Sequence, residues 1–166
     1  MKVGIGYDIH PMGKGRKLIL GGVEIPHTQG LVGHSDADAL VHAACDALLG
    51  AMGEGDLGRH YPSSDPRYKD ISSLKLLEDV SGMLATKGYR LVNLDTVIIA
   101  QAPRLGPHLA AMQTRMAEVL KVERVHVNVK VKSGEGLDAV GREEAPDAMT
   151  PLPTLASNRC APRFDA

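Results

Sequence analysis

The sequence has very few aromatic residues and almost no net charge. Among its 166 residues there are one Phe and no Trp, while hydrophobic residues make up 43%. The core must therefore be built from Val, Leu, Ile, Ala and Met, and a chain of this length is expected to form one domain with a substantial core. The net charge of -1 provides no general electrostatic field that would recruit nucleic acid or an anionic membrane.

Long apolar runs and closely spaced cysteines are also missing. No apolar stretch is long enough to span a bilayer, and the N-terminus enters a predicted strand without a signal peptide. Cys45 and Cys160 form no CxxC pair, so we expect two free thiols in a reducing compartment. The sequence therefore favours a cytoplasmic protein with neither a nucleic-acid nor a membrane partner.

An Asp-x-His pair lies near the N-terminus. Residues 2–10 alternate between apolar and other side chains, which is typical of a strand with its apolar side buried. Asp8 and His10 then project together from the opposite side. Gly4 and Gly6 are expected to leave that side bare beside them, with room for a ligand.

A histidine on a predicted helix complements this pair. Ser35 is predicted to cap the helix, with Asp38 at the third helical position, and apolar residues recur at helical spacing over 40–51. His42 then lies one turn from Asp38 and from Asp46. Either carboxylate is a candidate partner for the second nitrogen of the imidazole.

Together, Asp8, His10 and His42 form a candidate zinc site. A carboxylate and two imidazoles suit zinc, and three protein ligands leave a fourth position open, as in catalytic sites. The alternative is that the two histidines are unrelated surface or core residues. The combination of a glycine-flanked Asp-x-His and a helical histidine favours the metal site.

The remaining predicted elements provide the scaffold. They are a hairpin over 17–25, a helix capped by Ser72 or Ser73 and ended by Lys87 and Gly88, a strand over 89–100, a helix opened by Pro107, and a strand over 125–132.

Three loops contain candidate polar contacts. His34 precedes a predicted helix N-terminus, which can bind anions. The interpretation of His34 as a solvated loop residue is equally well supported by the pattern. Asp56 lies between glycines and could bind a hydroxyl group of a polyol, but the sequence favours a structural role in a turn. Residues 132–136 combine a lysine, a hydroxyl and a carboxylate, which suits a diphosphate with magnesium; the alternative is a polar loop.

Taken in order, the motifs resemble one family. They are Gly-x-Gly-Tyr-Asp-x-His at 4–10, His-Ser-Asp-Ala-Asp at 34–38 with His42, Gly-Asp-Leu-Gly at 55–58, Tyr-Pro-x-x-Asp-Pro at 61–66, Ile-Ala-Gln-Ala-Pro-Arg at 99–104, and Lys-x-Lys-Ser-Gly-Glu-Gly-Leu at 130–137 with Gly141 and Arg142. Over about residues 1–144 the chain resembles the 2-C-methyl-D-erythritol 2,4-cyclodiphosphate synthases of the non-mevalonate isoprenoid pathway.

The resemblance implies a fold and an assembly. We expect an α+β fold in which a mixed sheet of about four main strands packs on three helices on one face, with an additional N-terminal hairpin. We also expect a homotrimer whose sheets face the three-fold axis and whose active sites lie between subunits.

The resemblance also implies roles for individual residues. Asp8, His10 and His42 would hold zinc, Glu135 would hold magnesium or manganese on the diphosphate, and His34 and Ser133 would stabilise the transition state. The residues implied in substrate binding are Asp8, Ile9, His10, His34, Ser35, Asp56, Leu57, Gly58, Tyr61, Pro62, Ser63, Ser64, Asp65, Ala100, Gln101, Ala102, Pro103, Arg104, Leu105, Gly106, Lys132, Ser133, Gly134, Glu135 and Arg142.

The implied reaction is an intramolecular phosphoryl transfer. It converts 4-diphosphocytidyl-2-C-methyl-D-erythritol 2-phosphate to 2-C-methyl-D-erythritol 2,4-cyclodiphosphate and CMP. Two alternatives are a zinc-dependent phosphoester hydrolase and a catalytically impaired, zinc-stabilised binding module.

The C-terminal residues depart from the family pattern. Residues 145–166 contain four of the chain's ten prolines, at 146, 151, 153 and 162. Because proline has no N–H group for a sheet, the first three are expected to exclude a central strand. We therefore predict a catalytic domain over 1–144 and a disordered or peripheral tail over 145–166.

Overall fold

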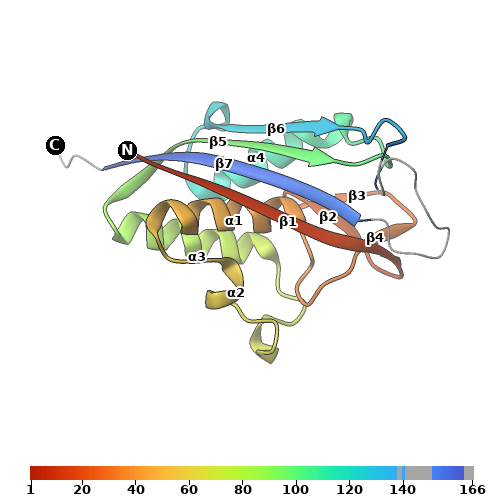
Figure 1. Cartoon of the computed structure of the whole chain (residues 1–166), viewed down its shortest axis with the longest axis horizontal. Helices are drawn as coiled ribbons and strands as arrows, with labels where there is room; N and C mark the ends of the chain where they lie inside the picture. Colours follow the sequence, from red (N-terminus) through yellow and green to blue (C-terminus); the bar gives the residue numbers. More distant parts are fainter. Residues whose placement is uncertain (138–139, 141–150, 163–166) are drawn as a thin grey trace.

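A mixed five-stranded sheet forms the backbone of the fold, and helices cover one of its faces (Figure 1). The computed structural model describes residues 1–137, 140 and 151–162. Across the sheet the strand order is β4-β1-β7-β5-β6, and β2 and β3 form a separate hairpin. The strands are β1 Lys2–Lys14, β2 Leu18–Leu20, β3 Val23–Ile25, β4 Gln29–Leu31, β5 Tyr89–Ile99, β6 Val127–Lys132 and β7 Pro151–Pro162. The helices are α1 Ala39–Met52, α2 Leu57–His60, α3 Ser73–Thr86 and α4 Leu109–Leu120, with 3-10 turns at Pro66–Tyr68, Gly106–His108 and Arg124–His126.

Most predicted elements are present where the sequence placed them. In the hairpin, Gly21 and Gly22 both have positive φ angles, which a tight two-residue turn requires. Parallel pairing joins β5 and β6, so the loops that follow Ile99 and Lys132 leave the same edge of the sheet. The α+β architecture and the three long helices are therefore confirmed.

The central helix α1 lies between the sheet and α3, and most of its residues are buried. It begins later than predicted. Ala37 has a φ of 58°, a left-handed conformation that cannot continue into a right-handed helix. Asp38, and not Ser35, is the N-cap, because its carboxylate accepts a hydrogen bond from the Val41 N–H at 3.1 Å.

The prediction for the two sides of β1 is wrong. Gly4 and Gly6 are buried, whereas the apolar residues between and after them face outward; Ile5 is 73% exposed. A Cβ atom on Gly6 would lie 2.0 Å from the Ala43 carbonyl oxygen, so the glycines do not leave room for a ligand. They allow α1 to pack directly against the strand.

The prediction that the tail is disordered or peripheral is wrong for residues 151–162. These residues form β7, which pairs antiparallel with β1 on one side and β5 on the other (Figure 1). Pairing with β5 ends at Thr154, so Pro151 and Pro153 have a neighbouring strand only on the β1 side. Missing N–H groups cost less there than in a strand paired on both sides. Residues 145–150 and 163–166 lie outside the described residues.

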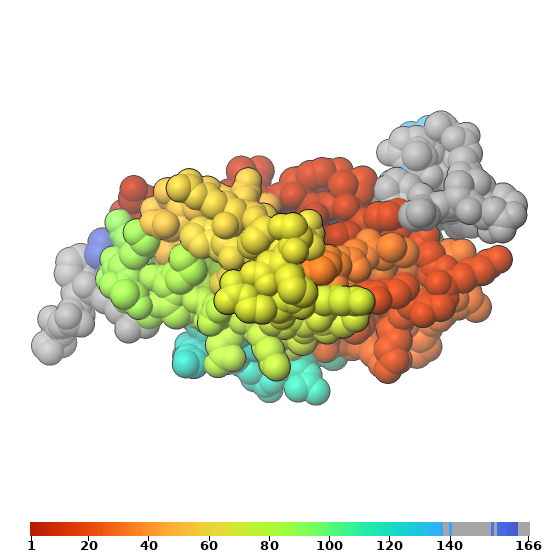
Figure 2. All heavy atoms as spheres, turned by 90° about the horizontal axis from the view of Figure 1, so that it is seen from below, coloured from red at the N-terminus to blue at the C-terminus, as the bar shows by residue number. Residues whose placement is uncertain are grey.

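The segment that contains α2 and the turn at Pro66–Tyr68 lies on the surface away from the sheet. In Figure 2 it is the yellow region, next to the orange residues of the N-terminal part. Two backbone hydrogen bonds join these regions: Asp70 N–H donates to the His34 carbonyl at 2.8 Å, and Asp36 N–H donates to the Ile71 carbonyl at 3.0 Å. This contact places the loop before α1 beside the α2 segment.

Candidate metal centre and active site

Three side chains converge where the middle of β1 lies over the start of α1. The Asp8 Oδ2 atom lies 3.1 Å from His10 Nε2 and 3.0 Å from His42 Nδ1, and the two imidazole nitrogens are 3.1 Å apart. Ligand atoms that share one zinc ion at tetrahedral angles lie roughly 3.4 Å apart. The predicted ligand set is therefore brought together in an arrangement that fits a divalent metal ion.

Each imidazole is held by a contact on the nitrogen that does not face the ligand triangle. The His10 Nδ1–H group donates to the Val32 carbonyl at 2.9 Å, so the lone pair of neutral His10 is on Nε2. On the helix, His42 Nε2 lies 2.8 Å from Ser73 Oγ and 3.2 Å from Ser35 Oγ. The nitrogen that faces the ligand triangle is thus Nε2 in one histidine and Nδ1 in the other.

The electrostatics of this cluster favour negative charge on the carboxylate. Burial raises the pKa of Asp8, but hydrogen bonds and charge from His10 and His42 outweigh it and hold that pKa well below its usual range. Burial lowers the pKa of His10, yet the Asp8 carboxylate reverses the effect and raises it. An anionic oxygen beside two imidazoles is the donor set expected for zinc or a similar cation.

The carboxylates predicted to support His42 have other partners. Fully buried Asp38 accepts hydrogen bonds from the N–H groups of Gly21 and Gly22, in addition to capping α1. Asp46 accepts a hydrogen bond from the Leu57 N–H at 2.7 Å and so ties α1 to α2. Because the helix begins after Ala37, Asp38 points toward the β2–β3 turn, and the prediction of a carboxylate bound directly to the imidazole is wrong.

A cavity of about 260 Å³ opens beside the ligand triangle. Its lining contains many of the predicted substrate-binding residues from the loops before α1 and around α2. The lining residues are His10, His34, Ser35, His42, Leu57, Gly58, Tyr61, Ser63, Tyr68 and Leu76. The candidate metal centre therefore faces a hollow large enough for part of a small molecule.

Two of the predicted loop residues have structural contacts that orient the cavity wall. The His34 Nε2–H group donates to the Asp65 carbonyl at 3.0 Å, which fixes the ring beside the cavity. Asp56 caps α2 by accepting from the Arg59 N–H at 2.9 Å, which is the turn role that the sequence favoured.

The predicted site residues of the loops 100–106 and 132–135 lie at the ends of β5 and β6 and are not among the residues that line this cavity. The Ala100 N–H donates to the Lys132 carbonyl at 2.9 Å, which joins the loops 100–106 and 132–135. In the second loop the Ser133 hydroxyl donates to Glu135 Oε1 at 2.5 Å, and Glu135 has a φ of 51°. Arg142 lies outside the described residues.

Sequence reasoning missed Ser73, which contacts His42, and Asp36, which contacts Ser73. Ser73 was predicted only as a possible helix cap and Asp36 only as part of a motif. In the structure, the buried Ser73 hydroxyl contacts His42, and it also donates to the Asp36 carboxylate. The contact between His42 and Ser73 depends on how α3 packs against α1, which no motif or periodicity in the sequence indicates.

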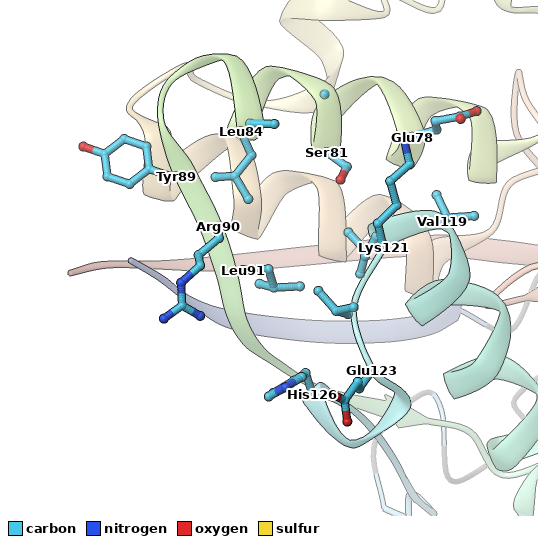
Figure 3. A pocket seen from close by; sticks show the side chains of 14 residues that line it. Glu78, Ser81, Leu84, Tyr89, Arg90, Leu91, Val119, Lys121, Glu123 and His126 are labelled. Atoms are coloured by element: carbon cyan, nitrogen blue, oxygen red, sulfur yellow. The ribbon is translucent and has the colours of Figure 1, made fainter. Parts of the chain in front are cut away.

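A larger hollow, of about 640 Å³, lies where α3 and α4 end. Arg90, Lys121 and His126 surround it, together with Glu78 and Glu123 (Figure 3). It contains none of the predicted site residues, and charges of both signs face it. Its size therefore does not make it a better candidate site than the smaller cavity beside the ligand triangle.

Among the described residues, no helix is both long and apolar enough to cross a membrane. Both cysteines are free thiols and buried, as predicted.

Comparison of the sequence with known proteins gives a consistent result. Residues 1–152 match the model of the YgbB family. The 2-C-methyl-D-erythritol 2,4-cyclodiphosphate synthase of Syntrophomonas wolfei is 55% identical over 87% of this chain and 92% of its own. The enzyme of the same name from Desulfosudis oleivorans is 56% identical over 90% of this chain and 89% of its own.

Solved structures are similar over nearly the whole chain. The bifunctional IspDF of Campylobacter jejuni superposes with a TM-score of 0.90 at 36% identity; the match covers 99% of this chain and 42% of that longer one. A 2C-methyl-D-erythritol-2,4-cyclodiphosphate synthase superposes with a TM-score of 0.85 at 31% identity, covering 96% of this chain and all of that one. IspF of Plasmodium falciparum, in complex with CDP, gives a TM-score of 0.83 at 27% identity and covers 98% and 97%.

Proposed function

The chain belongs to the YgbB family, and from that membership we propose that it catalyses the reaction for which its relatives are named, the formation of 2-C-methyl-D-erythritol 2,4-cyclodiphosphate. The names of these relatives support a cyclodiphosphate synthase, and they do not support the phosphoester hydrolase or the impaired binding module. The observation that carries the proposal is the convergence of Asp8, His10 and His42 on a cavity lined by His34.

The substrate is 4-diphosphocytidyl-2-C-methyl-D-erythritol 2-phosphate. An oxygen of the 2-phosphate forms a bond to the β-phosphorus, the bond from that phosphorus to the bridging oxygen breaks, and CMP leaves with the electron pair. Both reacting groups are anionic. The site must therefore neutralise charge and align the two groups, and it has less need of a strong base.

Zinc is the ion that we assign to Asp8, His10 and His42. When bound, it supplies a positive charge that polarises phosphate oxygens. The chain's own contribution is to hold one carboxylate oxygen and two imidazole nitrogens within 3.1 Å of one another. His34 stands on the cavity wall, and its Nε2–H group already donates to the Asp65 carbonyl. Its ring can therefore donate to the phosphates through Nδ1 only when it is protonated, and it then also supplies a positive charge.

We assign the diphosphate and the cytidine to the second half of the site. Glu135 offers a carboxylate for a magnesium or manganese ion, and Ser133 offers a hydroxyl; both are exposed at the end of β6. The loop 100–106 lies beside them at the end of β5. CDP in the structure of the P. falciparum relative supports a cytidine nucleotide as the ligand.

A homotrimer is the assembly that best unites the two halves. Within one chain β7 lies between β1 and β5, so two interstrand spacings, about 10 Å, separate β5 from β1, and β6 is one strand further away. The outer side of β1 exposes apolar residues, among them Val3 at 63% and Ile5 at 73%. A second copy that covers this apolar side would bury it and could bring its 100–106 and 132–135 loops to the cavity.

The direct test is to incubate the purified, zinc-loaded chain with the diphosphocytidyl substrate and to follow the products by phosphorus NMR. We expect equal amounts of CMP and cyclic diphosphate. His42→Ala is expected to abolish zinc binding and cyclisation while it leaves the far-ultraviolet circular dichroism unchanged. Equal zinc content and turnover in this variant would refute the assignment.

The same experiment separates the alternatives. A zinc-dependent hydrolase would cleave simple phosphodiesters such as bis(4-nitrophenyl) phosphate and would give no cyclic product. A binding module would take up the substrate unchanged. Either result would contradict the proposed reaction.

A further inference from the structure

We propose that Asp36 and Ser73 act as positioning residues for His42: the chain Asp36–Ser73–His42 holds the imidazole in the Nε2–H tautomer and so presents an unprotonated Nδ1 to the metal. This inference rests on the metal site within the proposed function. It does not depend on the identity of the substrate.

The direction of each hydrogen bond in the chain follows from the Asp36 carboxylate. Oδ2 of Asp36 accepts from the Ser73 N–H at 2.9 Å, and Oδ1 accepts from the Asp38 N–H at 3.2 Å. An ionised carboxylate has no proton to donate. The contact between Ser73 Oγ and Asp36 Oδ1 therefore uses the only hydroxyl proton of Ser73.

The tautomer of His42 follows from the same count of protons. Because the Ser73 hydroxyl donates to Asp36, its contact with His42 Nε2 at 2.8 Å can form only if Nε2 carries the proton. A neutral imidazole has one N–H group, so its lone pair must then be on Nδ1. Nδ1 is the atom that faces Asp8 Oδ2 and His10 Nε2.

In both histidines, therefore, the nitrogen that faces the ligand triangle carries the lone pair, but different partners fix the proton on the other nitrogen. Backbone carbonyl Val32 fixes the tautomer of His10 and cannot be removed by substitution. For His42, the side chains of Ser73 and Asp36 fix the tautomer. The contact between Ser73 and the ring is shielded from water, because Ser73 is fully buried and His42 is 8% exposed. Partners of this kind orient metal-bound histidines and raise their basicity.

Ser35 provides a matched control. Its hydroxyl also lies near His42 Nε2, at 3.2 Å, but it accepts from the Ala37 N–H and has no described contact with a carboxylate. If proximity of any hydroxyl to the ring were sufficient, Ser35→Ala and Ser73→Ala would have similar effects. If the link to Asp36 matters, Ser73→Ala will weaken the metal site clearly more than Ser35→Ala.

Asp36→Asn tests the direction of the bonds. An asparagine can offer one oxygen and one NH₂ group to Ser73, whose N–H and O–H both need acceptors. An NH₂ group facing Ser73 Oγ would turn the hydroxyl proton toward His42 Nε2 and shift the imidazole proton to Nδ1, the atom that must bind the metal. A neutral isostere is therefore expected to damage the site, as in other sites where an aspartate orients a histidine.

The experiment measures zinc affinity of the full chain by competition with a chromophoric chelator, with zinc alone as the probe. Ser73→Ala and Asp36→Asn should each weaken binding by about 10- to 100-fold. The double variant should bind zinc at most about threefold more weakly than the weaker-binding single variant, because the two residues act as one unit. Ser35→Ala should lose clearly less zinc affinity than Ser73→Ala, because its contact with His42 Nε2 is longer and no carboxylate orients its hydroxyl among the described residues.

Three results would overturn the inference. One is zinc affinity close to that of the wild type in Ser73→Ala and Asp36→Asn, even if their thermal stability falls, because that is the signature of a purely structural role. Another is an equal loss in Ser35→Ala. The third is a double variant whose loss is the product of the two single losses. Ser73→Ala keeps the Ser73 N–H bond to Asp36, so it remains interpretable if Asp36→Asn fails to fold.

His42→Ala in the same assay separates this inference from the proposed function. Loss of zinc binding in His42→Ala, with normal binding in the Ser73 and Asp36 variants, would reject the positioning chain alone. Retained binding in His42→Ala would reject the metal site itself and the inference with it.

Discussion

At the scale of single residues, the fold gives buried polar groups specific partners, and the sequence reveals only some of them. Asp8, His10 and His42 could be predicted because the period of a strand and of a helix places them on defined sides. Ser73 could not, because its contact with His42 depends on how α3 packs against α1. Local periodicity contains no information about such packing.

Asp38 offers a test of electrostatics in the core. Burial, together with the nearby Asp36 charge, raises the pKa of Asp38 to about 6, although three backbone N–H groups favour its ionised form. The folded state therefore holds the Asp38 proton more tightly than the unfolded chain, whose pKa is 3.8. The stability that this group contributes is complete at low pH and is lost as the pH rises through 6.

The measurement is the free energy of unfolding of the wild type minus that of Asp38→Asn, by urea titration from pH 4 to pH 7. This difference should fall by about 2 kcal/mol over that range. Groups that do not interact with Asp38 cancel in the difference. A difference that stays constant or increases with pH would show that the pKa of Asp38 is not raised.

At the scale of elements, β1 and β7 show where sequence rules fail. Alternation in β1 predicted the strand, but the apolar side is the exposed one, because helix α1 requires the close approach that only Gly4 and Gly6 permit. In β7 the prolines lie where pairing is one-sided. The strand also buries Thr154 Oγ1 and Asn158 Nδ2 without hydrogen-bond partners in the described part of the chain, and these two groups lower the stability that the strand gains by completing the sheet.

Cys160 tests the placement of β7. It is 1% exposed, and burial raises the pKa of its thiol to about 11. In a Cys45→Ala background, where Cys160 is the remaining cysteine, we expect thiol-reactive reagents at pH 8 to label the native protein at least about 100-fold more slowly than the protein in guanidinium.

The opposite result has a clear meaning. Labelling of Cys160 in the native protein at the rate seen in denaturant would place residues 151–162 outside the sheet. The original prediction of a peripheral tail would then be restored.

At the scale of the whole molecule, one chain holds the cluster of metal-ligand candidates, the separate loops that we propose as the second half of the site, and an exposed apolar strand. The candidate metal centre lies at the middle of β1, and the loops after β5 and β6 leave other strands of the same sheet. Sequence motifs predicted both halves, and the role of the second half stays a prediction. We propose that contacts between copies bring the two halves together.

Replacing Ile5 with lysine tests this view of the assembly. Ile5 lies on the exposed apolar side of β1, and burying a charge there would cost several kcal/mol. We expect the wild type to sediment as three chains of 17.7 kDa, about 53 kDa, and Ile5→Lys to sediment as single chains with little turnover.

Val125→Lys is the matched control. Val125 is 81% exposed but lies in the turn before β6, away from the outer side of β1, so this variant should remain assembled. A wild-type chain that sediments as a monomer and still forms the cyclic product would contradict the trimer.

The most direct test of the whole account is an anomalous difference map, recorded at the zinc absorption edge from crystals grown with zinc. We predict one strong peak per chain, bonded to Asp8 Oδ2, His10 Nε2 and His42 Nδ1, with Ser73 Oγ in contact with Nε2 of His42. A peak elsewhere, or no peak between these three side chains at full zinc loading, would contradict the account.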